Sequence, residues 1–119
     1  MVMTPEELRD RTKTFALRIV KLFRALPTRA DAQVMGKQLV RCGTSVAANY
    51  RAVCRSRTRA EFVARMAVVM EEADESVFWL EMISDSGIVA PKRLGGLTLE
   101  ARELTAIFTA AQHTARTRR

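Results

Sequence analysis

Residues 41–85 read RCGTSVAANYRAVCRSRTRAEFVARMAVVMEEADESVFWLEMISD, and their charge changes sign midway. Arginines dominate the first half, whereas carboxylates dominate the second half from Glu71 to Asp85. Apolar residues recur in both halves at steps of three and four, which is the spacing of an amphipathic α-helix. The stretch therefore predicts two consecutive helices joined by a basic turn, with a basic surface beside an acidic one.

Helix start and stop signals divide the whole chain in the same way. Thr58 and Glu61 have the spacing of a capping box, as do Thr4 and Glu7 near the N-terminus. Glycine and proline are frequent in residues 84–96, which predicts a long connection there. The predicted helices cover residues 5–26, 30–54, 59–84 and 98–113, and a basic C-terminal tail follows over residues 114–119.

These elements predict an all-α fold. Helices joined by two short links and one longer link are typical of an antiparallel up-and-down four-helix bundle, and 119 residues suffice for a single domain over residues 1–119. Gly36 and Gly43 each weaken the second helix by about 1 kcal/mol relative to alanine, so tertiary packing must hold it. The small residues around Gly43 would let a neighbouring helix approach closely.

The composition of the chain indicates which partners it binds and in which compartment it is located. The formal net charge of +7 favours nucleic acid or an anionic lipid surface as a partner. No apolar run approaches the roughly 20 residues that a membrane span needs, so we expect no membrane-embedded segment. The N-terminus lacks a secretory signal, which predicts a cytoplasmic location. Cys42 and Cys54 lack the spacing of metal ligands, and Cys42 falls in an apolar stripe typical of a core thiol.

No residue pattern indicates catalysis. Bundle proteins that bind two irons use Glu-x-x-His motifs, but the single histidine, His113, stands outside any such motif. The serines have no base within reach except His113, and the chain has neither a phosphate-binding glycine loop nor a Gly-x-Ser-x-Gly elbow. We therefore expect a protein that is not an enzyme and that has no metal site and no cofactor.

The carboxylates that follow Glu71 crowd one helix face unless cations lie opposite them. Lys37, Arg41 and Arg51 on the preceding antiparallel helix are the available partners. Pairing between the two helices would add only about 0–1 kcal/mol for each exposed ion pair. Asn49 and Asp74, if buried, would each need a polar partner.

Four arginines around the turn have no acidic residue among them in the sequence and are the candidate nucleic-acid-binding residues. Guanidinium groups bind phosphate oxygens in a bidentate way, and no aromatic residue interrupts the cluster to stack on bases. The alternative interpretation is a solvated turn that only keeps the protein soluble. The candidates are Arg51, Arg55, Arg57 and Arg59.

The helix predicted over residues 59–84 carries more apolar surface than one helix face can hold. Such a helix either lies at the centre of its bundle or buries one face against another subunit. The candidate oligomer-interface residues are Val63, Met70, Phe78, Trp79 and Met82. A protein-interaction or assembly module is therefore an alternative function.

Three segments also carry a family resemblance. The segments SVAAN at 45–49, AEF at 60–62 and EEADESVFWLE at 71–81 resemble the small bacterial four helix bundle protein family. That family includes proteins encoded within intervening sequences of 23S ribosomal RNA genes. The resemblance is clearest over residues 38–87, although here arginine-containing helix replaces the Ala-Glu-Gly turn that many members have after Asn49.

The resemblance implies an up-and-down bundle, no established catalytic activity and self-assembly into a ring, with a pentamer among the assemblies that it allows. A related group, the accessory proteins of diversity-generating retroelements, is basic and associates with nucleic acid and a reverse transcriptase. Our hypothesis is thus a non-enzymatic homo-oligomer that binds RNA or DNA phosphates. The alternative is an assembly module, or a module for a protein partner, without a nucleic-acid role.

Overall fold

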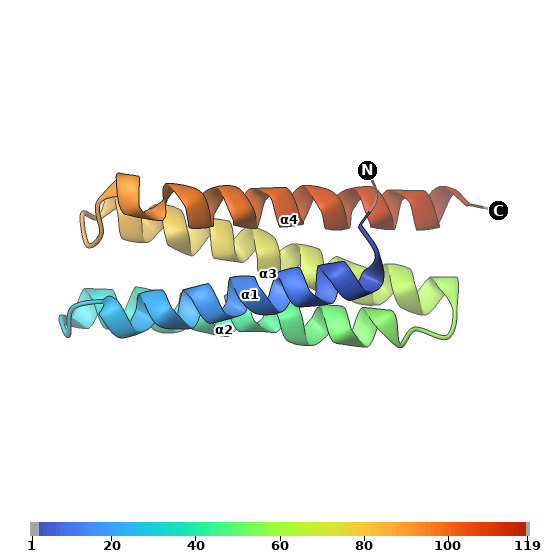
Figure 1. Cartoon of the computed structure of the whole chain (residues 1–119), viewed down its shortest axis with the longest axis horizontal. Helices are drawn as coiled ribbons and strands as arrows, with labels where there is room; N and C mark the ends of the chain where they lie inside the picture. The colour runs from blue at the N-terminus through green and yellow to red at the C-terminus, as the bar shows by residue number, and fades with distance from the viewer. Residues whose placement is uncertain (1–2, 119) are drawn as a thin grey trace.

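Four long helices run alternately up and down the molecule (Figure 1). The computed structural model describes residues 3–118. Its helices are α1 (Pro5–Ala25), α2 (Ala30–Cys54), α3 (Arg59–Asp85) and α4 (Pro91–Thr117). The prediction of an all-α fold is confirmed, and the first three helices begin at the predicted residues. None of the four combines the length and the apolar character needed to cross a bilayer.

Side-chain caps explain why α1 and α3 begin where they do. The Thr4 hydroxyl accepts a hydrogen bond from the Glu7 amide at 3.1 Å, and the Glu7 carboxylate accepts one from the Thr4 amide at 3.0 Å. This reciprocal pair lowers the pKa of Glu7, because the bonds favour its charged form. At α3, the Thr58 hydroxyl accepts from the Glu61 amide at 3.0 Å. Both predicted starts therefore have a structural cause.

The fourth helix is longer than predicted at both ends. It begins at Pro91 rather than at residue 98, so the long connection expected over residues 84–96 is wrong. Proline suits a first helical turn, and Leu94 and Leu97 bury their side chains, which holds the glycine-containing turn in place. The helix also continues through Thr117 instead of ending in a tail from residue 114, while residue 119 lies outside the described residues.

Among the glycines of residues 84–96, Gly87 is the one whose backbone conformation makes the turn between α3 and α4. Its φ angle is +80°, in the left-handed region that favours glycine, whereas Gly95 and Gly96 lie within α4. The sequence pattern could not separate a turn glycine from helical glycines. That is why the predicted connection extended too far.

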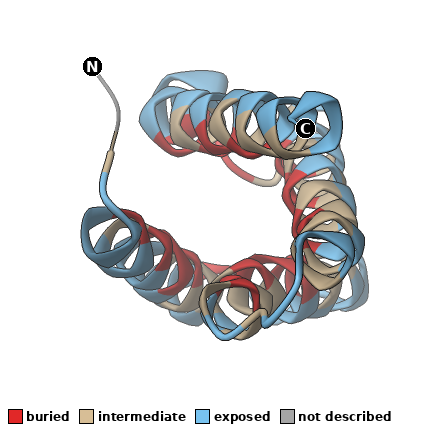
Figure 2. Ribbon diagram, turned by 90° about the vertical axis from the view of Figure 1, so that its right-hand side faces the viewer, coloured by how far each residue is buried: buried red, intermediate tan, exposed pale blue. Residues whose placement is uncertain are grey.

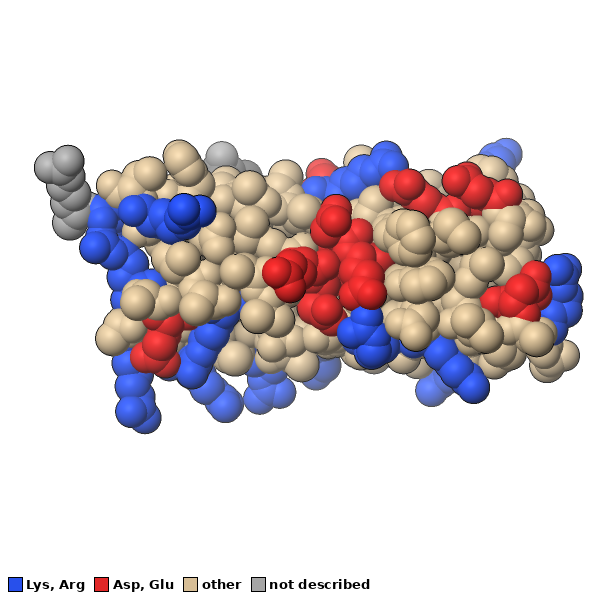
Figure 3. Space-filling model, turned by 180° about the vertical axis from the view of Figure 1, so that it is seen from behind, with Lys and Arg blue, Asp and Glu red and all other residues tan. Residues whose placement is uncertain are grey.

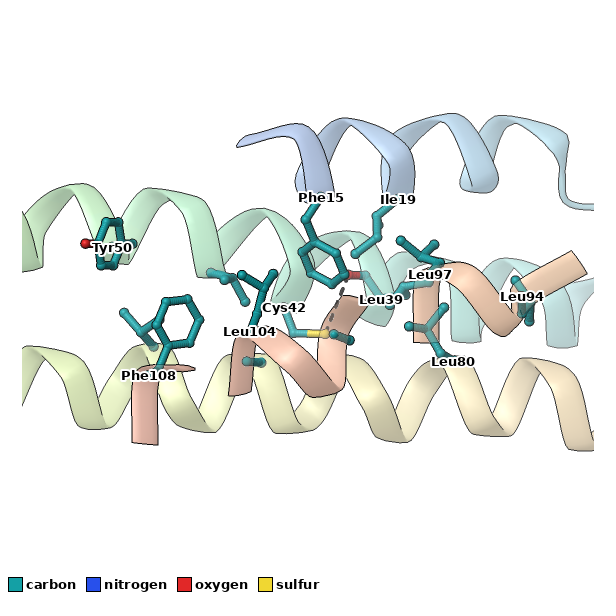
Figure 4. Close-up of a cluster of buried hydrophobic side chains, with 14 of the residues drawn as sticks. Phe15, Ile19, Leu39, Cys42, Tyr50, Leu80, Leu94, Leu97, Leu104 and Phe108 are labelled. Carbon is teal, nitrogen blue, oxygen red and sulfur yellow. Dashed lines mark hydrogen bonds between the residues drawn. The ribbon is translucent and has the colours of Figure 1, made fainter. Parts of the chain in front are cut away.

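Buried residues lie on the inner side of a curved row of helices, with α1 and α4 at its two ends (Figure 2). Each helix packs mainly on its neighbours in the chain, and α1 also approaches α4, less closely than any two consecutive helices approach each other. The core includes Phe15, Leu39, Leu80 and Phe108 (Figure 4). In the same cluster, the ring of Tyr50 on α2 stacks on that of Phe108 on α4, with centroids 5.7 Å apart. The interior thus joins helices that are not adjacent in sequence.

Glycines on α2 allow α1 to pack closely against it. A Cβ atom at Gly43 would overlap the side chain of Ile19, which is fully buried. A Cβ atom at Gly36 would lie only 2.6 Å from Leu26 and 2.7 Å from Phe23. The predicted close approach of a helix at Gly43 is therefore confirmed, with α1 as that helix.

A half-buried ion pair ties α1 to α4 across the side where they barely touch. Arg11 donates two hydrogen bonds to Glu100, at 2.8 and 2.7 Å, and lies 3.4 Å from Glu103. The Arg11 bond lowers the pKa of Glu100 below its usual range. Charge-assisted bidentate pairs of this kind are stronger than neutral hydrogen bonds. The pair therefore forms a direct polar link between the two outer helices.

Replacing Gly43 with alanine tests the α1–α2 packing. Overpacking a dense core costs about 1–3 kcal/mol, whereas alanine adds at most about 1 kcal/mol of helicity, so we expect a lower free energy of unfolding in urea. The matched control is Gly95→Ala, since nothing lies near its added methyl group. The control should be slightly more stable than the wild type. A Gly43→Ala protein as stable as Gly95→Ala would contradict the packing.

Glu100→Gln tests the link between α1 and α4. Folding lowers the pKa of Glu100, so the ionised carboxylate stabilises the folded state. This stabilisation is fully present above the ordinary carboxyl pKa of about 4.3 and is lost as pH falls through the lowered pKa. We expect urea unfolding to show a loss of about 1–2 kcal/mol at pH 7 that shrinks near pH 3. Glu103→Gln, on the exposed carboxylate beside the same arginine, should cost less. Equal losses in both variants at pH 7 would argue against a special role for Glu100.

Candidate nucleic-acid interface

The arginines of the α2–α3 turn are all exposed, and the structure brings three of them to one hollow. Arg51 lies in the last turn of α2, Arg55 caps that helix and Arg57 lies in the turn itself. All three line a cavity of about 750 Å³. None of them forms an ion pair with any residue between 3 and 118. Arg59, at the start of α3, is exposed but is not among the lining residues.

Two residues in the same cavity were not among the sequence candidates. Arg65 donates to the Ala52 carbonyl at 2.8 Å and pairs with Glu61 at 3.1 Å. Glu61 also accepts a hydrogen bond from the Arg57 amide at 3.4 Å. In the sequence, residues 51–59 contain no carboxylate, but the fold brings Glu61, paired with Arg65, into the same cavity. The i, i+4 spacing of Glu61 and Arg65 was the signal that could have indicated this pair.

These contacts order the cavity wall before any ligand arrives. Arg65 satisfies a carbonyl in the last turn of α2, and Glu61 binds the turn that precedes α3. The guanidinium group of Arg65 is thus fixed on two sides, whereas those of Arg51, Arg55 and Arg57 remain available. A phosphate group in this cavity would meet several donors without a large rearrangement.

Charge is distributed unevenly over the molecule. The α2–α3 turn, the start of α1 and the end of α4 lie at one end (Figure 1), where Arg116 and Arg118 are also exposed. Figure 3 shows mostly basic side chains at this end, with some acidic atoms among them, a compact acidic patch nearer to the middle of the same face, and both kinds of charge at the opposite end. The basic end therefore favours anions: the carboxylates from Glu71 onward on α3 do not cover it, and Glu61 in its cavity is paired with Arg65.

The acidic run on α3 is partly neutralised from α2. Arg41 pairs with Glu75 at 2.7 Å and with Glu72 at 3.3 Å, which confirms the predicted pairing for Arg41. Within residues 3–118, Lys37 and Arg51 form no ion pair with the run. These pairs are largely exposed, so they add little stability.

The two polar residues flagged in the sequence need no distant partner. The Asn49 amide donates to the Ser45 carbonyl at 2.9 Å and to the Ser45 hydroxyl at 2.6 Å. Asp74 is exposed to solvent. Asn49 therefore has hydrogen-bond partners one helix turn away, and Asp74 is hydrated, so neither residue indicates a binding site.

The candidate oligomer-interface residues do not form one exposed patch. Only Phe78 is largely exposed, at 51%, while Met70 and Trp79 pack against the core and Val63 and Met82 are half-buried. The Val63 carbonyl accepts a hydrogen bond from Gln112 of α4 at 3.0 Å. Because α3 lies between α2 and α4, these neighbours cover part of its wide apolar surface.

The cysteines and the histidine show no catalytic arrangement. Cys42 is buried and accepts a hydrogen bond from Ser76 at 3.3 Å, and burial raises the pKa of its thiol. Cys54 is a free thiol, and His113 is exposed near the end of α4. Across residues 3–118, no three His, Cys, Asp or Glu side chains gather in a way that would hold a metal ion.

Comparisons with known proteins agree with this fold. A family model described as 23S rRNA-intervening sequence protein matches residues 7–110. The structure is similar to that of a protein with unknown function from the S23 ribosomal protein family of Bacteroides thetaiotaomicron VPI-5482, with a TM-score of 0.86 and 28% sequence identity. The similarity covers 94% of this chain and 100% of the other. No curated protein matches the chain.

Proposed function

The chain belongs to the 23S rRNA-intervening sequence protein family. We propose that it is a non-enzymatic, homo-oligomeric bundle that binds the phosphates of RNA or DNA. The observation that carries the proposal is the cavity between α2 and α3. There, the exposed guanidinium groups of Arg51, Arg55 and Arg57 meet beside the ordered Arg65.

Unpaired guanidinium groups in one hollow suit a phosphate ligand. Each can give two parallel hydrogen bonds to phosphate oxygens, and neutralising phosphates releases counterions from the nucleic acid. The cavity is lined by arginine, alanine and Glu61, with no aromatic side chain among its lining residues to stack on a base. Binding should therefore depend on the backbone and be indifferent to base sequence.

Self-association would strengthen such binding. A ring of subunits, such as a pentamer, would place several arginine cavities on one particle. The positive electrostatic potentials of these cavities would then add up. The exposed Val68 and Phe78 on α3, at 43% and 51%, offer apolar contact surface for another subunit.

Arg55→Gln/Arg57→Gln tests the arginine cavity. Both side chains are exposed and unpaired within the described chain, so the variant should fold. We expect weaker binding to duplex DNA and a log K versus log salt slope that is flatter by about 0.9 for each phosphate that the variant no longer neutralises. Fluorescence anisotropy over a salt series measures this slope.

The matched control is Lys92→Gln/Arg93→Gln, which removes the same charge at the opposite end of the molecule (Figure 1). It should leave the slope near the wild-type value. An unchanged slope in the Arg55/Arg57 variant would overturn the site assignment. Absence of wild-type binding at low salt would overturn the function itself.

An assembly or protein-interaction module is the second candidate, and the exposed Phe78 favours it. The Phe78 ring packs edge to face with Trp79, at 4.9 Å between centroids, yet half of it stays open to solvent. Such a ring on the outer side of α3 is a natural anchor for a second chain. This function requires no nucleic acid.

Phe78→Ser tests that surface. We expect light scattering coupled to size exclusion to show an oligomer for the wild type and a smaller particle for the variant, because the variant has no apolar anchor there. Leu17→Ser on α1 is the control, since Leu17 is similarly exposed on another helix. A monomeric wild type, or an assembly unaffected by Phe78→Ser, would count against the role of this surface.

A further inference from the structure

We propose that the arginine cavity is one end of a longer phosphate track that crosses α2 to reach α1. The ligand is then a nucleic-acid backbone with several consecutive phosphates, not a single phosphate group or a mononucleotide. This inference rests on the proposed nucleic-acid function and names the form of ligand that the site takes.

A second hollow adjoins the arginine cavity. It has a volume of about 490 Å³ and lies between α1 and α2, where its charged lining residues are Arg9, Asp10, Lys13 and Arg51. Arg51 and Ala48 also line the arginine cavity. The two hollows therefore share a wall, and one guanidinium group is available to both.

Small residues on α2 keep the track open. Ala48, Arg51, Ala52 and Arg55 follow one another at i, i+3, i+4 and i+7, so they lie on one face of the helix. Ala48 is exposed beside Arg51, and Ala52, which is half-buried, lies between Arg51 and Arg55, so no long side chain separates these arginines on this face. At about 1.5 Å per residue this face extends about 10 Å along α2, so the track crosses the helix over a surface of about that width.

The charges along the track sum to a positive potential. Arg9 and Lys13 on α1 are exposed and form no ion pair with residues 3–118. Two carboxylates oppose them: Asp10 lies in the second hollow, and Glu61 in the first is paired with Arg65. Cations still outnumber carboxylates in both hollows. A polyanion that spans both therefore gains more than an isolated phosphate in either one.

Arg9→Gln/Lys13→Gln tests the extension over α1. With duplex DNA, we expect the log K versus log salt slope to flatten by about 0.9 for each phosphate that these two side chains neutralise, in addition to the effect of the Arg55/Arg57 change. Lys21→Gln/Arg24→Gln is the matched control, because it removes the same charge from the far end of the same helix. Arg9→Lys/Lys13→Arg, which keeps both charges, should retain the wild-type slope.

Competition experiments distinguish a polymer track from a simple anion site. At equal phosphate concentration, we expect duplex DNA to displace a labelled duplex far better than inorganic phosphate or a mononucleotide does. Equal competition by these small anions would overturn the track. If the wild type binds duplex DNA and Arg9→Gln/Lys13→Gln binds it with the same salt slope, the track over α1 is overturned, but the proposed nucleic-acid function is not. No duplex binding at low salt would overturn both.

Discussion

The antiparallel packing of α2 against α3 is the constraint on which the other features depend. These two helices share the most extensive interface in the bundle, with Cys42 and Ser76 in contact at its buried centre. Their packing forces the chain to reverse within a short turn, so that Arg51 and Arg55 at the end of one helix face Arg65 near the start of the next. Burial of apolar side chains in the core thus creates the basic cavity on the surface.

The outer helices are held differently. α1 is held on α2 by close contacts at Gly36 and Gly43, and α4 packs on α3, but the backbones of α1 and α4 approach each other at few positions. The Arg11–Glu100 pair joins them with directional hydrogen bonds instead. The same α1–α2 packing brings Arg9 and Lys13 beside Arg51. Close helix packing therefore sets both the shape of the bundle and the length of the basic surface.

Much of the fold was predictable because local signals and apolar periodicity agreed. The helix starts at Pro5 and Arg59 have caps that can be read from a few residues, and the stripes of α1 to α3 have uniform spacing. The start of α4 was missed because glycines at 95 and 96 weaken the local pattern, while the burial of Leu94 that offsets them depends on distant residues. Of the candidate site, the arginines were predictable from their spacing, whereas Glu61 and Arg65 were not recognised.

By itself, the sequence determined that the chain forms four amphipathic helices, that its basic residues gather at one turn and that carboxylates follow on the next helix. These are properties of short segments, since capping, periodicity and charge depend on residues near one another in the chain. Only the tertiary structure decided that three of the turn arginines share a cavity, that Arg41 rather than Lys37 or Arg51 pairs with the acidic run, and that Arg9 and Lys13 of α1 lie beside Arg51. Those outcomes depend on the register between helices, which is set by how buried side chains such as Ile19 fit against glycines on another helix.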